Sequence, residues 1–187
     1  MSLPDGSAGN HHGLMHIGLV SPDQHDSLSS LLLEAHAHHR EVAAADGEAM
    51  RAHLMDQLLA PHSPVRLVVA VEPNSSCDVV GVAALVLLPS VIEPTGDARW
   101  QCQLKELYVR GSHRGQGVGE ALVAWSAGYA LEHGCGRMDW NVQASNAGGI
   151  RFYAGLGAAP VMDRLSYRMD RVAMERLVSE TRPLTRN

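Results

Sequence analysis

A strand that runs into a glycine-rich turn and then into a helix most constrains how this chain folds. An alternating pattern over residues 101–109 predicts the strand, and the turn that follows, residues 114–119, reads RGQGVG. A helical pattern then continues from Leu122 to its end near Gly134. Glycines let backbone N–H groups converge without interference from a Cβ atom. Because the new helix adds unpaired N–H groups and a positive dipole end, the junction predicts a cradle for a diphosphate.

Several ligands or none would suit such a turn. An ATP-type loop needs Lys followed by Ser or Thr after the glycines, and this chain has Val118, Gly119 and Glu120 there. An NAD-binding dinucleotide fold needs GxGxxG directly after the strand, whereas the spacing here is GxGxG. Asp139 stands about 20 residues on, where a ribose-binding acid would be, but it falls inside an expected strand. A plain glycine-rich connection remains open on this motif alone.

The segments before the turn predict strands and two helices. Residues 15–20 predict a first strand, and β-branched runs over residues 65–71 and 79–88 predict a hairpin across a polar turn. One helix is expected from Ser21-Pro22, and a second from Asp46 to the residue before Pro61.

The segments after the turn complete an α/β pattern. After the turn's own helix we expect a strand over residues 137–142 and a short helix over 146–156. Closing strands are expected at Val161 and 165–169, and a last helix near 172–178. A hairpin followed by a strand–helix–strand unit predicts a mixed sheet with helices on both faces.

Length and charge narrow the class of protein. The 187 residues suit one domain, which we place at residues 14–180, between a flexible N-terminal tail (1–13) and a polar C-terminal tail (181–187). The formal net charge of −5 argues against a nucleic-acid or anionic-membrane surface.

The cysteines and histidines bear on the compartment and on metal binding. Three widely spaced cysteines without a CxxC pair, no secretory signal and no apolar run of ~20 residues favour a cytoplasmic protein with reduced thiols. Cys102 and Cys135 are expected to be small buried residues. His36, His38 and His39 lack the i,i+4 spacing of helical metal ligands, so we expect no metal.

The wider series of motifs resembles the GNAT N-acetyltransferase superfamily, whose acetyl-CoA loop reads Q/R-x-x-G-x-G/A. Arg114, Gly117 and Gly119 fill that pattern. The resemblance covers residues 104–161 and includes LKELYV before the loop and the series N…RFY…LG after it. It is strongest to the branch that contains small-amine and polyamine acetyltransferases.

The resemblance implies a fold and a cofactor. The fold is a mostly antiparallel sheet splayed between the strands at residues 101–109 and 137–142. The exposed edge of the first of these strands would pair with the pantetheine arm of acetyl-CoA, and the glycine loop would hold the pyrophosphate. The cofactor contacts implied are Leu107, Tyr108, Val109, Arg114, Gly115, Gln116, Gly117, Val118, Gly119 and Asn146. Asn146 is also well suited to cap a helix, and both roles can hold.

The resemblance also implies direct attack of a primary amine on the thioester. Tyr153 matches the family's general acid, and a phenol with an ordinary pKa of ~10 can donate a proton at neutral pH. Glu106 fills one acidic position of a segment that often supplies the base, but Lys105 replaces the other. Strand alternation places these two side chains on opposite faces. Glu106 is therefore either the base or a structural acid, and both alternatives stay open.

The motifs determine the amine acceptor and the oligomeric state less closely than the cofactor. The resemblance implies a small-molecule or peptide amine as acceptor and makes a homodimer an expectation. A different class, a non-catalytic acetyl-CoA-binding sensor or regulatory module, would keep the loop without needing Tyr153 or a base.

Overall fold

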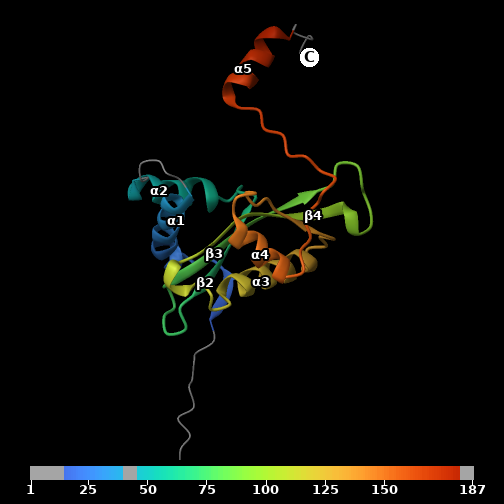
Figure 1. Ribbon diagram of the computed structural model, residues 1–187. Helices are drawn as coiled ribbons and strands as arrows, with labels where there is room; N and C mark the ends of the chain where they lie inside the picture. The colour runs from blue at the N-terminus through green and yellow to red at the C-terminus, as the bar shows by residue number, and fades with distance from the viewer. Residues whose placement is uncertain (1–14, 40–45, 182–187) are drawn as a thin grey trace, which may run out of the picture. The chain divides into compact units, whose positions relative to one another are not determined.

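The computed structural model describes residues 15–39 and 46–181, which fall into two compact units divided after Gln143. The first unit contains the sheet and three of the labelled helices of Figure 1, and the second contains α4 and α5. The expected tail at residues 1–13 lies outside the described residues. No helix among the described residues is long and apolar enough to cross a membrane.

The first unit is built on a five-stranded sheet in the order β1-β2-β3-β4-β5. All neighbouring strands are antiparallel except the last pair, β4 and β5, which is parallel. The expected mixed, mostly antiparallel sheet is therefore confirmed. The strands are β1 (His16–Leu19), β2 (Val65–Val71), β3 (Val79–Pro89), β4 (Trp100–Val109) and β5 (Met138–Asp139).

Helices cover both faces of this sheet, because its strands are apolar on both sides. One core cluster packs Leu28 and Leu31 against Val69 on one face, and the other packs Leu122 against Val68 on the opposite face. Adjacent β2 residues thus belong to opposite clusters, as strand alternation requires. The helices concerned are α1 (His25–His39), α2 (Gly47–His53), which continues as a π-helical turn (Leu54–Leu58), and α3 (Val118–Glu132).

Local signals fix the ends of the first two helices. A capping box at Ser21 precedes a short 3-10 turn (Pro22–Gln24) that runs into α1, and the Asp46 side chain accepts a hydrogen bond from the Glu48 N–H. Both starts were expected from sequence. Side-chain caps of this kind satisfy N–H groups that the helix itself cannot pair.

Strands β4 and β5 pair only over a short stretch. Cys102 lies opposite Met138 and Gln103 lies opposite Asp139, and no further pairing between these strands occurs in the described chain. The expected strand over residues 137–142 is therefore too long. A strand persists only where its backbone groups find partners, and a bulge bends β4 directly after the paired stretch. The sheet splays at this point, as expected.

The bulge also corrects the expected alternation at Lys105. Leu85 of β3 pairs with Leu104, and the preceding Ala84 pairs with Glu106, so β4 contains one extra residue. Leu104 and Leu107, three apart, both pack in the cluster on the α3 face. Lys105 and Glu106 together oppose Ala84, which belongs to the cluster on the α1 face. The two charged side chains therefore share one face rather than taking opposite ones.

The second unit contains α4 (Ala147–Gly155) and α5 (Arg171–Glu180). Asn146 and Asp170 cap these helices through their side chains. The closing strands expected at Val161 and residues 165–169 are wrong, because this stretch contains no strand. Its apolar side chains are exposed, and no ladder partner is present for it in the described chain. A β pattern without a neighbouring strand leaves its backbone unpaired, so it does not form.

Candidate functional site: the glycine loop and the splayed edge of β4

The loop between β4 and α3 has the backbone geometry of an anion cradle. A short 3-10 turn (Gly111–His113) follows β4, and Gly115 and Gly117 then have φ angles of 73° and 82°. This left-handed region favours glycine. Gly117 is the N-cap of α3, and within the described chain no side chain caps that helix start. Its first N–H groups are therefore available to an anion at the exposed loop.

Side chains tie this loop to the ends of two strands. Gln116 Nε2 donates to the Ser112 carbonyl oxygen at 2.8 Å. His113 Nε2 lies 2.8 Å from Glu72 Oε2 at the end of β2, and Arg114 Nε donates to the Val109 carbonyl oxygen at 2.9 Å. The cradle is thus held in place before any ligand binds. Sequence reasoning missed the partnership of Glu72 and His113, because the two are distant in the chain.

The backbone of β4 beyond the bulge presents alternate residues to the splayed edge. The Arg110 N–H donates to the Val80 carbonyl oxygen of β3 at 2.9 Å. Since backbone groups of successive strand residues point to opposite sides, Val109 and Leu107 direct theirs toward the β5 side. Tyr108, between them, directs its backbone toward β3. The edge is therefore formed by two of the three residues expected there.

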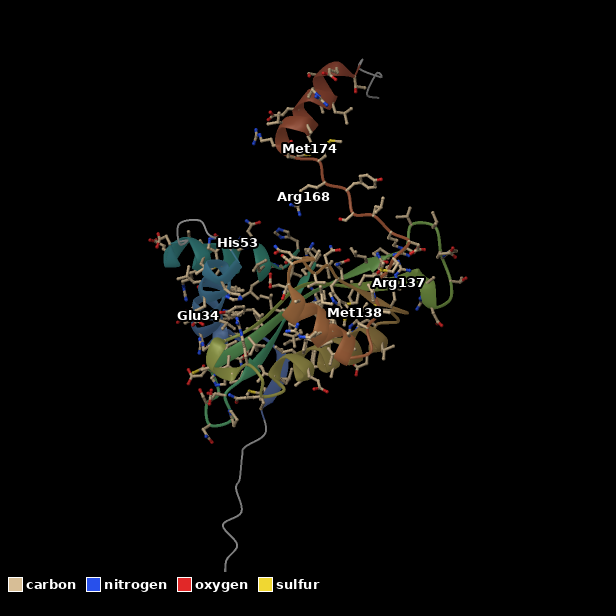
Figure 2. All side chains as sticks on the ribbon, in the orientation of Figure 1. Glu34, His53, Arg137, Met138, Arg168 and Met174 are labelled. Carbon is tan, nitrogen blue, oxygen red and sulfur yellow. The ribbon has the colours of Figure 1, made fainter. Side chains whose placement is uncertain are left out.

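A row of aromatic and cationic side chains lies on the α1 face of this edge. The Arg114 Cζ atom lies 5.4 Å from the centroid of the Tyr108 ring, a cation–π distance. The His38 ring of α1 lies 5.8 Å from the same Tyr108 ring. Arg110 Nη2 pairs with Glu34 Oε1 at 3.0 Å, and Glu34 on α1 is labelled in Figure 2. The end of α1 therefore borders the strand end that precedes the glycine loop.

The structure brings some of the expected site residues together. Glu106, half-buried, and Tyr108, buried, share the α1 face of β4, next to Arg114 and the loop. The loop residues Gly115, Gln116, Gly117 and Gly119 are contiguous with them, and Val118 is buried in the α3 core. Leu107 packs on the opposite face.

Two expected site residues belong to the second unit. Asn146 Oδ1 accepts a hydrogen bond from the Gly149 N–H at 2.9 Å, so its expected capping role is confirmed. Tyr153 lies on α4, with its ring centroid 5.0 Å from that of Phe152. Their contacts with acetyl-CoA stay predictions.

Two of the three cysteines, Cys102 and Cys135, are structural. Cys102 and Cys135 are buried in the cluster on the α3 face, as expected, whereas Cys77 is exposed. Burial, with a smaller contribution from neighbouring Cys135, raises the pKa of the Cys102 thiol to about 11. Burial also raises the pKa of Cys135. A thiol that resists ionisation is a poor nucleophile, so neither cysteine is suited to nucleophilic catalysis.

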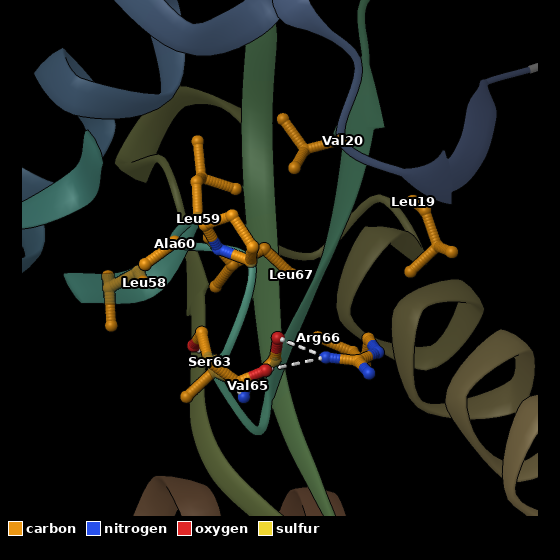
Figure 3. Close-up of a pocket in the computed structure, with 10 residues that line it drawn as sticks. Leu19, Val20, Leu58, Leu59, Ala60, Ser63, Val65, Arg66 and Leu67 are labelled. Atoms are coloured by element: carbon orange, nitrogen blue, oxygen red, sulfur yellow. Dashed lines mark hydrogen bonds between the residues drawn. The ribbon is translucent and has the colours of Figure 1, made fainter. Parts of the chain in front are cut away.

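A shallow groove of about 290 Å³ lies elsewhere, at the start of β2 (Figure 3). Leu58, Leu59 and Leu67 are among its lining residues, and Arg66 donates to the carbonyl oxygens of Ser63 and Val65 at its rim. The glycine loop is tied to the other end of β2 through Glu72. The groove is thus distinct from the diphosphate cradle.

A mixed sheet that splays beside a strand–glycine loop–helix junction defines an α/β protein with a backbone cradle suited to a diphosphate. Residues 28–158 match the acetyltransferase (GNAT) family, and the chain belongs to this family. The match includes β4, the loop, α3 and α4.

Individual relatives and a solved structure are similar to this chain. The chain is 30% identical over 117 residues to thialysine N-epsilon-acetyltransferase of Sus scrofa, covering 58% of this chain and 62% of the relative. It is 34% identical over 82 residues to the Mus musculus protein of the same name, covering 40% and 45%. The chain thus spans less than two thirds of either relative. Among solved structures, an integron cassette protein from the mobile metagenome of V. cholerae is similar, with a TM-score of 0.77, 26% identity and coverage of 88% of this chain and 97% of that one.

Proposed function

We propose that this protein transfers an acetyl group from acetyl-CoA to a primary amine by direct attack. The observation that carries the proposal is the open cradle at residues 114–119, which adjoins a strand edge that β5 leaves unpaired. Membership of the GNAT family supports acetyl-CoA as the ligand. The chemistry supplied by acetyl-CoA is an activated acetyl group on a thioester.

The donor would bind mainly through backbone groups. The N–H groups at the start of α3 would hold the diphosphate, with Arg114, Gly115, Gln116, Gly117, Val118 and Gly119 forming the loop around it. Leu107 and Val109 offer backbone groups to the pantetheine arm. The Val109 N–H would stabilise the oxyanion as the amine adds to the carbonyl. Asn146 would add a contact near the thioester, beyond its capping role.

The reaction needs one group to take a proton and one to give it. The amine nitrogen forms a bond to the carbonyl carbon, and the bond from that carbon to sulfur breaks. Glu106, on the α1 face of β4, would accept the proton of the attacking amine directly or through water. Tyr153 would donate the proton that the departing sulfur receives. This face is bordered by Tyr108 and His38, so we place the acceptor there.

A non-catalytic acetyl-CoA sensor is the second candidate, favoured by one observation. The usual acidic side chain before Glu106 is replaced by Lys105, and a binder needs no base. The two candidates predict different outcomes when acetyl-CoA is mixed with amines.

Release of CoA from acetyl-CoA tests the proposal. Polyamines, aminoglycosides, amino acids and peptides would be supplied in turn, and thiol release followed with a chromogenic reagent. A Cys77→Ser background removes the exposed thiol that would otherwise react. We expect release with at least one primary amine. Tight acetyl-CoA binding without release from any acceptor would identify a sensor instead.

A further inference from the structure

Lys105 is the only lysine in this chain. The other members of its 15 Lys and Arg residues are arginines. It occupies the bulge of β4, where an extra residue redirects side chains. Bulges occur often next to active sites for this reason. A lysine at this position is therefore a candidate to contact a ligand.

The bulge places this charge on the face where we put the acceptor. Lys105 and Glu106 together oppose Ala84, on the α1 face, while Leu104 and Leu107 fill the α3 face. Two opposite charges thus stand side by side at the splay of the sheet. Tyr108, two residues further along β4, shares their face.

Other cations near this strand end already have partners. Arg110 pairs with Glu34 at 3.0 Å. Arg114 is held by the Val109 carbonyl oxygen and the Tyr108 ring. Lys105 is exposed, and within residues 15–39 and 46–181 its side chain makes no hydrogen bond or ion pair. Its ammonium group is thus available to an anionic ligand.

We propose that Lys105 binds a carboxylate of the acceptor, so that the substrate is an amine of the amino-acid type rather than a polyamine. This inference rests on the proposed function. An ammonium on the acceptor face attracts a carboxylate and repels a second ammonium. This one residue would therefore favour amines of the amino-acid type and disfavour polyamines. Glu106 beside it accepts the proton of the attacking amine. Lys105 itself takes part in no bond that forms or breaks.

Matched acceptor pairs test this selection. L-lysine and cadaverine differ by one carboxylate, as do L-ornithine and putrescine. We expect the wild type to acetylate the carboxylate-bearing member of each pair with a kcat/KM about tenfold or more above that of its partner, as one charge-assisted contact would give. Lys105→Gln should abolish this preference, and Lys105→Glu should reverse it in favour of the diamines.

Control variants separate recognition from folding. Lys105→Arg keeps the charge and should retain the preference. The affinity for acetyl-CoA should be the same in all these variants, because the donor binds through the loop. Equal kcat/KM values for lysine and cadaverine in the wild type, or an equal loss for both acceptors in Lys105→Gln, would overturn the inference. Absence of transfer to every amine tested would instead overturn the proposed function.

Discussion

The glycine loop and the bulge of β4 are close in the chain, and we assign them different tasks that depend on different parts of the residue. The loop, residues 114–119, offers backbone N–H groups, and its geometry depends on glycines at positive φ. The bulge offers the side chains of Lys105 and Glu106, and its geometry depends on one extra residue in a strand. Backbone recognition tolerates many sequences around a few glycines, whereas side-chain recognition changes with one substitution. Acetyl-CoA binding should therefore be little affected by substitutions around the glycines, whereas one substitution at the bulge should change the choice of acceptor.

The largest effect should follow loss of Tyr153, the proposed proton donor. Tyr153→Phe removes one oxygen and should lower kcat about a hundredfold, the scale of general acid catalysis, with little change in acetyl-CoA affinity. Steady-state rates and equilibrium titration measure the two quantities. Tyr167→Phe is the matched control, because Tyr167 is 88% exposed in the same unit. An unchanged rate in Tyr153→Phe would remove Tyr153 from the acid role.

A smaller effect, on the pH dependence of stability, should show that the α3 face of β4 is packed and has a structural role. The folded chain holds the Cys102 thiol protonated up to about pH 11, whereas an unfolded thiol ionises near 9.0. Because the folded pKa is the higher one, this contribution to the free energy of unfolding is complete below pH 9.0 and is lost as the pH rises through about 11. Urea unfolding at about pH 8 and about pH 10.5 measures the loss.

Two readouts sharpen this prediction. Cys102→Ala should flatten the decline of stability with pH, relative to the wild type, even if it lowers stability at neutral pH. Iodoacetamide should modify Cys77 in the folded protein but reach Cys102 and Cys135 only after unfolding. Rapid alkylation of Cys102 in the folded protein would show that this face of β4 is open rather than packed.

Sequence patterns predicted the elements whose signals are local. The β-branched run over residues 65–71 matches β2, and the caps at Ser21, Asp46 and Asn146 lie where expected. Each of these depends on neighbours within a few residues. The glycine loop was predicted for the same reason.

Features that depend on distant partners were not predicted. The bulge at Lys105 has no local signature, because it is defined by how β4 registers against β3. Strand β5 is shorter than its pattern, since its length depends on where β4 bends away. The contact of His113 with Glu72 joins two loops far apart in the sequence. The proposed acceptor side of the site consists largely of such features, so the sequence predicts the proposed donor more clearly than the acceptor.

The affinity of two glycine variants for acetyl-CoA tests most directly whether residues 114–119 hold the donor. Gly117 and Gly96 both have positive φ, at 82° and 72°, and a Cβ atom at either would meet nothing within 4 Å. Aspartate strains the backbone at either position, and more at Gly96, whose ψ of −169° lies in a region kept almost entirely for glycine, whereas ψ is −5° at Gly117. Only at Gly117 would its carboxylate meet the diphosphate. By calorimetric titration, Gly117→Asp should weaken acetyl-CoA binding about tenfold or more, while Gly96→Asp should bind like the wild type. Equal affinity in both variants, or a wild type that binds NAD and not acetyl-CoA, would contradict the account.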